Sequence, residues 1–263
     1  MVNDSTKNEN LSPSMIAFYF IISLIINSAG NVLTLATSDK IHPSFLGSAY
    51  WTAAEANLGI ALHWNLFWTF LILGMLISVL NAVLVGKFNV KRIFGNLIYM
   101  VPFSALIQVF ENFFIGKFSI YGGLPEAKTP MMVAVYVFLN FLGVALIGIA
   151  ISIYQRVNFV LHPADDLMQI LRFKYFNGNA IIAMWASYIP PTIMAIIALM
   201  ITHQFTNFGL GTIFAFLFQG TFTSLGDKYV FKNLVHQNFD VGEKNIKPTQ
   251  AAKEPNQVSK IQH

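Results

Sequence analysis

The stretches KIHPSFLG (residues 40–47) and VLHPADDLM (residues 160–168) each place a His-Pro pair between two long apolar runs, 120 residues apart. Each half of the chain reads as an apolar run, a His-Pro connector, a second run, a short loop and a third run. Asn57 and Asn177 keep the same spacing from the two pairs. This pattern predicts that the chain contains one membrane unit twice.

The composition indicates a membrane protein. Of the 263 residues, 55% are hydrophobic and only 11% are charged, whereas a soluble domain carries about 25% charged residues. Windows of about 20 residues without a charge can cross a hydrocarbon core of ~30 Å as helices, and lipid leaves the backbone no other regular choice than helix or closed barrel. Six helical spans are predicted, near residues 16–37, 64–86, 97–115, 131–154, 180–202 and 209–230.

The Lys and Arg residues predict the orientation of these spans. Lys40, Lys117 and Lys128 fall on one side of the membrane, and the other 13 of the 16 basic residues fall on the opposite side. Cytoplasmic loops carry the basic excess, so both termini are expected in the cytoplasm. Three crossings per half is an odd number, so the halves enter from opposite faces. The predicted fold is therefore all-α and polytopic, with six transmembrane helices as two inverted repeats; eight crossings with parallel repeats are the alternative.

The predicted organisation has five parts. They are a polar N-terminal tail (1–15), membrane repeat 1 (16–116), a linker (117–130), membrane repeat 2 (131–232) and a disordered cytoplasmic tail (233–263).

Several function classes are excluded by the sequence. The chain has no Cys, which rules out disulfides and thiol chemistry. It has no metalloprotease, phosphate-loop, nucleophile-elbow or dinucleotide motif, so it is expected not to be an enzyme and to need no cofactor. Its six His lack metal-ligand spacing. The net charge of +4 comes from loops and the tail rather than one compact face, which argues against nucleic acid.

Each His-Pro connector is expected to contain a short amphipathic or re-entrant helix. Proline suits the first turn of a helix, and Asp165 and Asp166 favour the first turn of a helix over 164–176. The first copy, over 44–59, is less polar but carries Glu55. Two interpretations stay open: a helix lying on the membrane surface, or a half-helix whose N-terminus faces an anionic group. Asp165 is a candidate for coupling or gating.

The run HPADDLM (162–168), followed by FGLGTIFAFLFQG (208–220), resembles the YczE/YitT-like bacterial integral membrane proteins. Their second half has a Pro-x-Asp-x-Leu-Met run and a later Gly-x-Gly-Thr segment. The likeness covers roughly residues 16–230, but Phe45 stands where that family has an acidic residue in its first connector. The resemblance implies a multi-pass protein of the bacterial cytoplasmic membrane and no defined substrate class.

Polar residues inside the spans are candidates for solute binding, because a polar group at membrane depth is costly. Asn27 and Asn31 are four residues apart and share a helix face. The alternative role is hydrogen bonding between helices. The substrate-binding candidates are Asn27, Asn31, Asn140, Gln108 and Gln219.

Further candidates for coupling or gating come from matched positions in the halves. Aligning Gly95 with Gly211 places Glu111 opposite Asp227, although both can also be ordinary interfacial carboxylates. Pro190 and Pro191 interrupt the fifth span. Interrupted helices at matching places indicate a site near the membrane midplane, and a packing kink is the alternative.

The sequence favours a small permease of the secondary-transporter type for an unidentified small solute. The alternative is an accessory or regulatory membrane protein that binds a partner protein or lipid. The expected partner is the lipid bilayer. Whether the chain also forms a homo-oligomer or binds another protein stays open.

Overall fold

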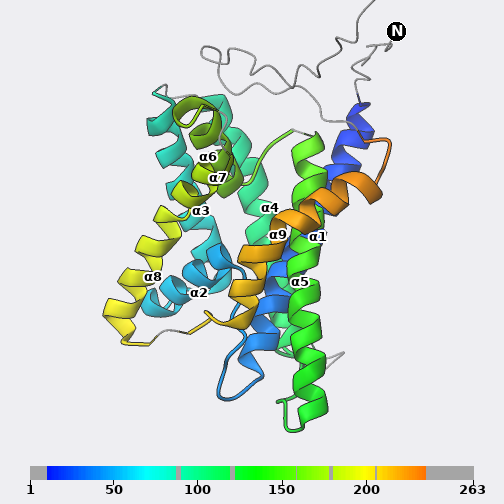
Figure 1. Ribbon diagram of the computed structural model, residues 1–263, viewed down its shortest axis with the longest axis vertical. Helices are drawn as coiled ribbons and strands as arrows, with labels where there is room; N and C mark the ends of the chain where they lie inside the picture. The colour runs from blue at the N-terminus through cyan, green and yellow to red at the C-terminus, as the bar shows by residue number, and fades with distance from the viewer. Residues whose placement is uncertain are drawn as a thin grey trace, which may run out of the picture.

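The structure is a computed structural model that describes residues 11–86, 90–118, 122–157, 159–177, 180–204 and 206–234. Within these residues the chain is helical, with no β-strand (Figure 1). The elements are α1 (Pro13–Asp39), α2 (Tyr50–Leu62), α3 (Leu66–Val85), α4 (Val90–Phe114), α5 (Pro130–Val157), α6 (Pro163–Ile170), the π-helical turn η1 (Leu171–Tyr175), α7 (Ala180–Ser187), α8 (Ile189–Thr202) and α9 (Leu210–Tyr229). Most of the two predicted tails, 1–10 and 235–263, lies outside the described residues.

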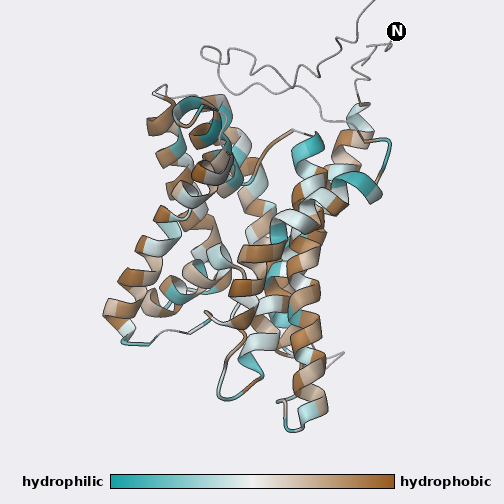
Figure 2. Ribbon diagram, in the orientation of Figure 1, coloured by the Kyte–Doolittle hydropathy of each residue, from teal (hydrophilic) through white to brown (hydrophobic). Residues whose placement is uncertain are grey.

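Five helical segments in the described chain are long and apolar enough to cross a membrane. They are Pro13–Asp39, Leu66–Val85, Arg92–Phe114, Pro130–Val157 and Ile182–Thr202. Hydrophobic residues predominate along these helices, as Figure 2 shows, and side chains such as Ile193 and Met200 on α8 are exposed. The sixth predicted span coincides with α9, whose 20 residues are not among the five.

The helices α1 and α5 pack against each other on one side of the molecule and run in opposite directions (Figure 1). They approach most closely at Gly30 and Gly143, where a Cβ on either residue would lie 2.7 to 2.8 Å from the carbonyl oxygen of the other. Small residues permit such close helix packing in membranes. At one end of the pair, the Ala127 amide donates to the Lys40 carbonyl over 2.8 Å.

The remaining helices exchange partners between the two halves of the chain. The short helix α2 packs against α8 of the second half, and α6 packs against α3 of the first half. Within the halves, α4 packs against α1, and α9 packs against α5. Two pairs of helices therefore join the two halves of the chain, and the α3–α4 contact has no equally strong equivalent between α8 and α9.

The first connector lies against the start of α9. The amides of Leu210 and Gly211 donate to the carbonyls of Phe45 and Leu46 over 2.8 and 2.5 Å. A Cβ on Gly211 would meet Asn140 Oδ1 at 2.1 Å. A Cβ on Gly209 would lie 2.2 Å from the Phe45 carbonyl oxygen, so Gly209 is required by the neighbouring backbone and Gly211 by the Asn140 side chain.

The two connectors differ in detail from the sequence prediction. Pro163 opens α6, as expected, but helix α6 continues as a π-helical turn rather than as regular helix to residue 176. In the first connector the helix begins at Tyr50 instead of residue 44, because the backbone of residues 45–48 is hydrogen-bonded to Asn207 and to the start of α9. Asn57 is buried in α2, whereas Asn177 lies in an exposed turn, so their equal spacing has no structural counterpart.

Candidate functional site

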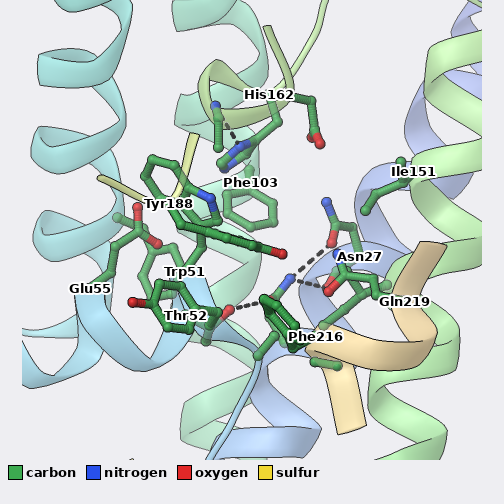
Figure 3. A pocket seen from close by; sticks show the side chains of 18 of the residues that line it. Asn27, Trp51, Thr52, Glu55, Phe103, Ile151, His162, Tyr188, Phe216 and Gln219 are labelled. Carbon is green, nitrogen blue, oxygen red and sulfur yellow. Dashed lines mark hydrogen bonds between the residues drawn. The ribbon is translucent and has the colours of Figure 1, made fainter. Parts of the chain in front are cut away.

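A cavity of about 90 Å³ lies between the two halves of the bundle (Figure 3). Its wall includes residues of α1 to α6 and of α9, together with Tyr188 between α7 and α8. Both short helices begin at it: Tyr50 and Thr52 come from the first turn of α2, and Ala164 and Asp165 from the first turn of α6. The cavity is therefore formed jointly by the two halves.

A chain of hydrogen bonds forms one side of the wall. Asn27 Nδ2 donates to the Tyr99 hydroxyl over 2.8 Å, and its Oδ1 accepts from Asn31 Nδ2 over 2.9 Å. The Thr52 hydroxyl donates to Asn31 Oδ1. Since Asn27 and Asn31 are one helical turn apart on α1, the chain joins the middle of α1 to the start of α2. Both predicted asparagines line the cavity and also hold α2 in place.

Glu55 faces the cavity from the second turn of α2 (Figure 3). Its side chain is 2% exposed, and Oε1 has no hydrogen-bond partner among the described residues. The helix α2 is not one of the membrane-spanning segments. Burial raises the pKa of Glu55 to about 8, because a low dielectric disfavours the charged form.

The start of α6 contributes a second carboxyl group. Asp165 accepts a hydrogen bond from the Tyr154 hydroxyl, and burial raises its pKa to about 6. His162 caps the helix, since its Nδ1 accepts from the Ala164 amide over 3.2 Å. Burial lowers the pKa of His162 to about 4, so this ring is neutral at pH 7. Asp165 is therefore placed at the cavity with a partner already in the protein.

The neighbouring Asp166 points away from the cavity wall to an ion pair. Arg92 Nε donates to Asp166 Oδ2 over 2.8 Å, and Asn81 Nδ2 donates to the Pro163 carbonyl over 2.9 Å. These contacts fix the start of α6 against α3 and α4.

The interrupted fifth span also reaches the cavity. The chain leaves α7 at Ser187 and starts α8 at Ile189, so the break falls at Tyr188, directly before Pro190 and Pro191. The Tyr188 and Tyr50 rings lie 4.8 Å apart between centroids. The two prolines do not line the cavity, but the break that they accompany places Tyr188 in its wall.

Among the predicted amides, Gln219 of α9 lies in the cavity wall, but Asn140 and Gln108 do not. Asn140 is completely buried, and its Nδ2 lies 3.0 Å from the Thr34 carbonyl and 2.9 Å from the Gly47 carbonyl. It therefore fastens the first connector to α1. Gln108 accepts from the Phe67 amide over 3.2 Å and donates to Glu111.

Glu111 and Asp227 lie outside the cavity at matched ends of α4 and α9. Glu111 and Asp39 line a separate pocket of about 250 Å³. Asp227 accepts from the Ser152 hydroxyl over 2.6 Å and lies 3.3 Å from Arg156 Nε. Arg156 is 2% exposed and donates to carbonyls at the end of α9, so this group joins the ends of α5 and α9.

Sequence reasoning did not select Glu55, Thr52 and Tyr188 as site residues. The available signal is a lone carboxylate in the apolar stretch SFLGSAYWTAAEANLG (44–59), for which the sequence leaves both a surface helix and a re-entrant helix open. In the described part of the chain, no group of three His, Asp or Glu side chains could hold a metal ion.

The helical fold, the apolar spans and the internal polar cavity define a multi-pass α-helical membrane protein. Residues 15–228 match the family described as a family of unknown function, DUF6198, and the chain belongs to that family. No curated protein and no solved structure matches the chain.

Proposed function

We propose that the protein is a six-span permease of two inverted repeats, with both termini in the cytoplasm, that moves a small solute through the central cavity. The observation that carries the proposal is the cavity itself, because both halves build its wall and both short helices begin there. Binding sites at the interface of repeats, formed by discontinuous helices, are typical of secondary transporters.

The packing supports the inverted arrangement. A two-fold axis in the membrane plane would relate α1 to α5, α2 to α6, α3 to α7 and α8, and α4 to α9. It would pair α2 with α8 and, equivalently, α6 with α3, which are the pairs observed. The arrangement counts α9 as the sixth span; its 20 residues are about 30 Å long, enough for a hydrocarbon core.

The mechanism is alternating access around a fixed site. The Arg92–Asp166 ion pair closes the bundle at the start of α6, and the contact of residues 45–48 with α9 closes it from the other half. Opening one closure at a time would expose the cavity to one side of the membrane and then to the other.

Cysteine labelling tests this proposal without knowledge of the solute, because the natural chain has no Cys. Gln219→Cys places a thiol in the cavity wall, and the exposed positions Ser44→Cys and Phe159→Cys mark the two connectors. Each variant is treated in cells and in inverted vesicles with a membrane-impermeant thiol reagent.

We expect Ser44→Cys to react only from outside, Phe159→Cys only from the cytoplasm, and Gln219→Cys from both sides. Reaction of both connector positions from the same side would contradict the inverted topology. Reaction of Gln219→Cys from one side alone would contradict alternating access and favour an accessory protein with a static binding site.

A further inference from the structure

We infer that the central cavity binds a small organic cation of the primary-amine class, with the Glu55 carboxylate as its anionic partner. The inference rests on the proposed function, because it names the class of solute for the same cavity. It also assigns a role to Glu55, whose Oε1 has no hydrogen-bond partner among the described residues.

Glu55 is the starting point of the argument. It is buried, it lines the cavity, and Oε1 has no hydrogen-bond partner among the described residues. A buried polar atom without a partner is costly and calls for an explanation such as an occupant of the site. An ammonium group supplies N–H donors and the compensating positive charge.

The charge of the wall favours a cation over an anion. Among the described residues that form the wall there is no Lys and no Arg, but there are two carboxyl groups, Glu55 and Asp165. The N-termini of α2 and α6 bring partial positive charge to the cavity. Each of these two helices already carries one of the two carboxyl groups within its first two turns. The helix N-termini therefore do not require an anionic ligand.

The aromatic residues favour an organic cation over a metal ion. Trp51 and Tyr188 line the cavity together with Glu55 (Figure 3), and Tyr50, Phe70 and Phe103 also belong to the wall. Ammonium groups bind well to the faces of aromatic rings. Calcium and magnesium instead require about six oxygen ligands, usually including several carboxylates, and no group of three His, Asp or Glu side chains in the described part of the chain could hold a metal ion. A volume of about 90 Å³ limits the ligand to a few heavy atoms.

Proton exchange follows from the same geometry. The other titratable groups in the wall are Tyr50, Tyr154, His162, Asp165 and Tyr188, and α3, which packs on α2, has no titratable side chain. Because the pKa of Glu55 is about 8, its carboxyl group is mostly protonated at pH 7. A bound cation therefore displaces one proton, which would couple the solute to a proton moving in the opposite direction.

Calorimetric titration of the full-length protein in lipid nanodiscs with methylammonium tests the inference. We expect the affinity to rise about tenfold per pH unit up to about pH 8 and then to level off. One proton should be released per bound cation in weakly buffered solution below that pH. Sodium and potassium should compete poorly.

Glu55→Gln preserves the shape of the side chain and should weaken methylammonium binding at pH 8 at least tenfold and abolish its pH dependence. Glu126→Gln is the matched control, because it removes a carboxylate outside the cavity and should bind as the natural protein does. Glu55→Asp, which keeps the charge, should retain the pH dependence with reduced affinity and so reports on binding if the Gln variant unfolds.

Absence of methylammonium binding to the folded natural protein would overturn the inference, as would unchanged binding by Glu55→Gln. Competition by acetate at the same site would show that the cavity takes anions. In each of these cases the labelling of Gln219→Cys from both sides would still uphold the permease, so the two proposals fail separately.

Discussion

The helices α2 and α6 start at the same cavity from opposite halves of the chain, yet they use their carboxyl groups differently. In α6, Asp165 accepts from Tyr154, and Asp166 forms an ion pair with Arg92. In α2, Glu55 has an oxygen without a partner in the described structure. The comparison teaches that two short helices at one cavity can differ in how their carboxyl groups are held: α6 is fixed by charge, whereas α2 keeps a buried carboxyl oxygen without a partner in the described structure.

The largest effect is expected from breaking the ion pair that fixes the start of α6. Arg92→Ala leaves the Asp166 carboxylate, whose side chain is only 4% exposed, without its cation. Removing one partner of a buried ion pair costs about 3–5 kcal/mol, and the lower end applies because Arg92 is one-fifth exposed. Thermal unfolding in detergent would measure the loss.

Two further variants sharpen this prediction. Arg92→Ala combined with Asp166→Asn should recover part of the stability, because the uncompensated charge is removed. Lys228→Ala removes an exposed cation at the end of α9 and should have little effect. Equal unfolding temperatures for Arg92→Ala and Lys228→Ala would show that the ion pair does not fix α6.

The packing glycines give a second, smaller test of the same comparison. A Cβ on Gly211 would lie 2.1 Å from Asn140 Oδ1, whereas a Cβ on Gly95 would lie 3.1 Å from Cγ1 of Val160 in the second connector. Overpacking costs typically 1–3 kcal/mol, and we expect about 2 kcal/mol for Gly211→Ala. Gly95→Ala should cost clearly less, because the Val160 side chain can adjust and Ala favours helix.

Chemical or thermal unfolding of both variants would test this difference. A Gly95→Ala variant that is as unstable as Gly211→Ala would mean that the second connector is packed as tightly on α4 as the first is on α9.

The positions of most long helices could be predicted from the sequence. An apolar run of about 20 residues indicates where a helix can cross the membrane. The predicted span 131–154, for example, falls within α5 (Pro130–Val157). The start of α2 could not be predicted in this way. It depends on the contact of residues 45–48 with α9, about 160 residues further along the chain, and this contact has no local signal.

The candidate site was predictable only in part for a related reason. Asn27, Asn31, Gln219 and Asp165 line the cavity, but Asn140, which looks equivalent in the sequence, faces the first connector. Polarity in a span reveals that a residue avoids lipid, but not whether it faces a cavity or a neighbouring helix. Glu55 could not be selected from the sequence, because the pattern left open whether its helix lies on the membrane surface or enters the membrane.

The smallest effect is expected at an exposed group of charges beside the first connector, formed by Lys40, His42 and Glu126. Glu126 Oε1 lies 3.0 Å from Lys40 Nζ, and Glu126 Oε2 lies 3.2 Å from His42 Nε2. The hydrogen bond from Lys40 lowers the pKa of Glu126 below its ordinary value of 4.5. Such a carboxylate stabilises the fold above its ordinary pKa, and the contribution is lost as the pH falls through the lowered value.

Because this cluster is exposed to solvent and screened by salt, Glu126→Gln should leave the unfolding temperature at pH 7 unchanged within error at physiological ionic strength. Unfolding measured at low and at high salt would test this, with Arg92→Ala as the reference for a buried pair. If Glu126→Gln lowered the unfolding temperature as much as Arg92→Ala does, charge would fix both connectors equally. The contrast between a second connector that is fixed by charge and a first connector that is not would then be wrong.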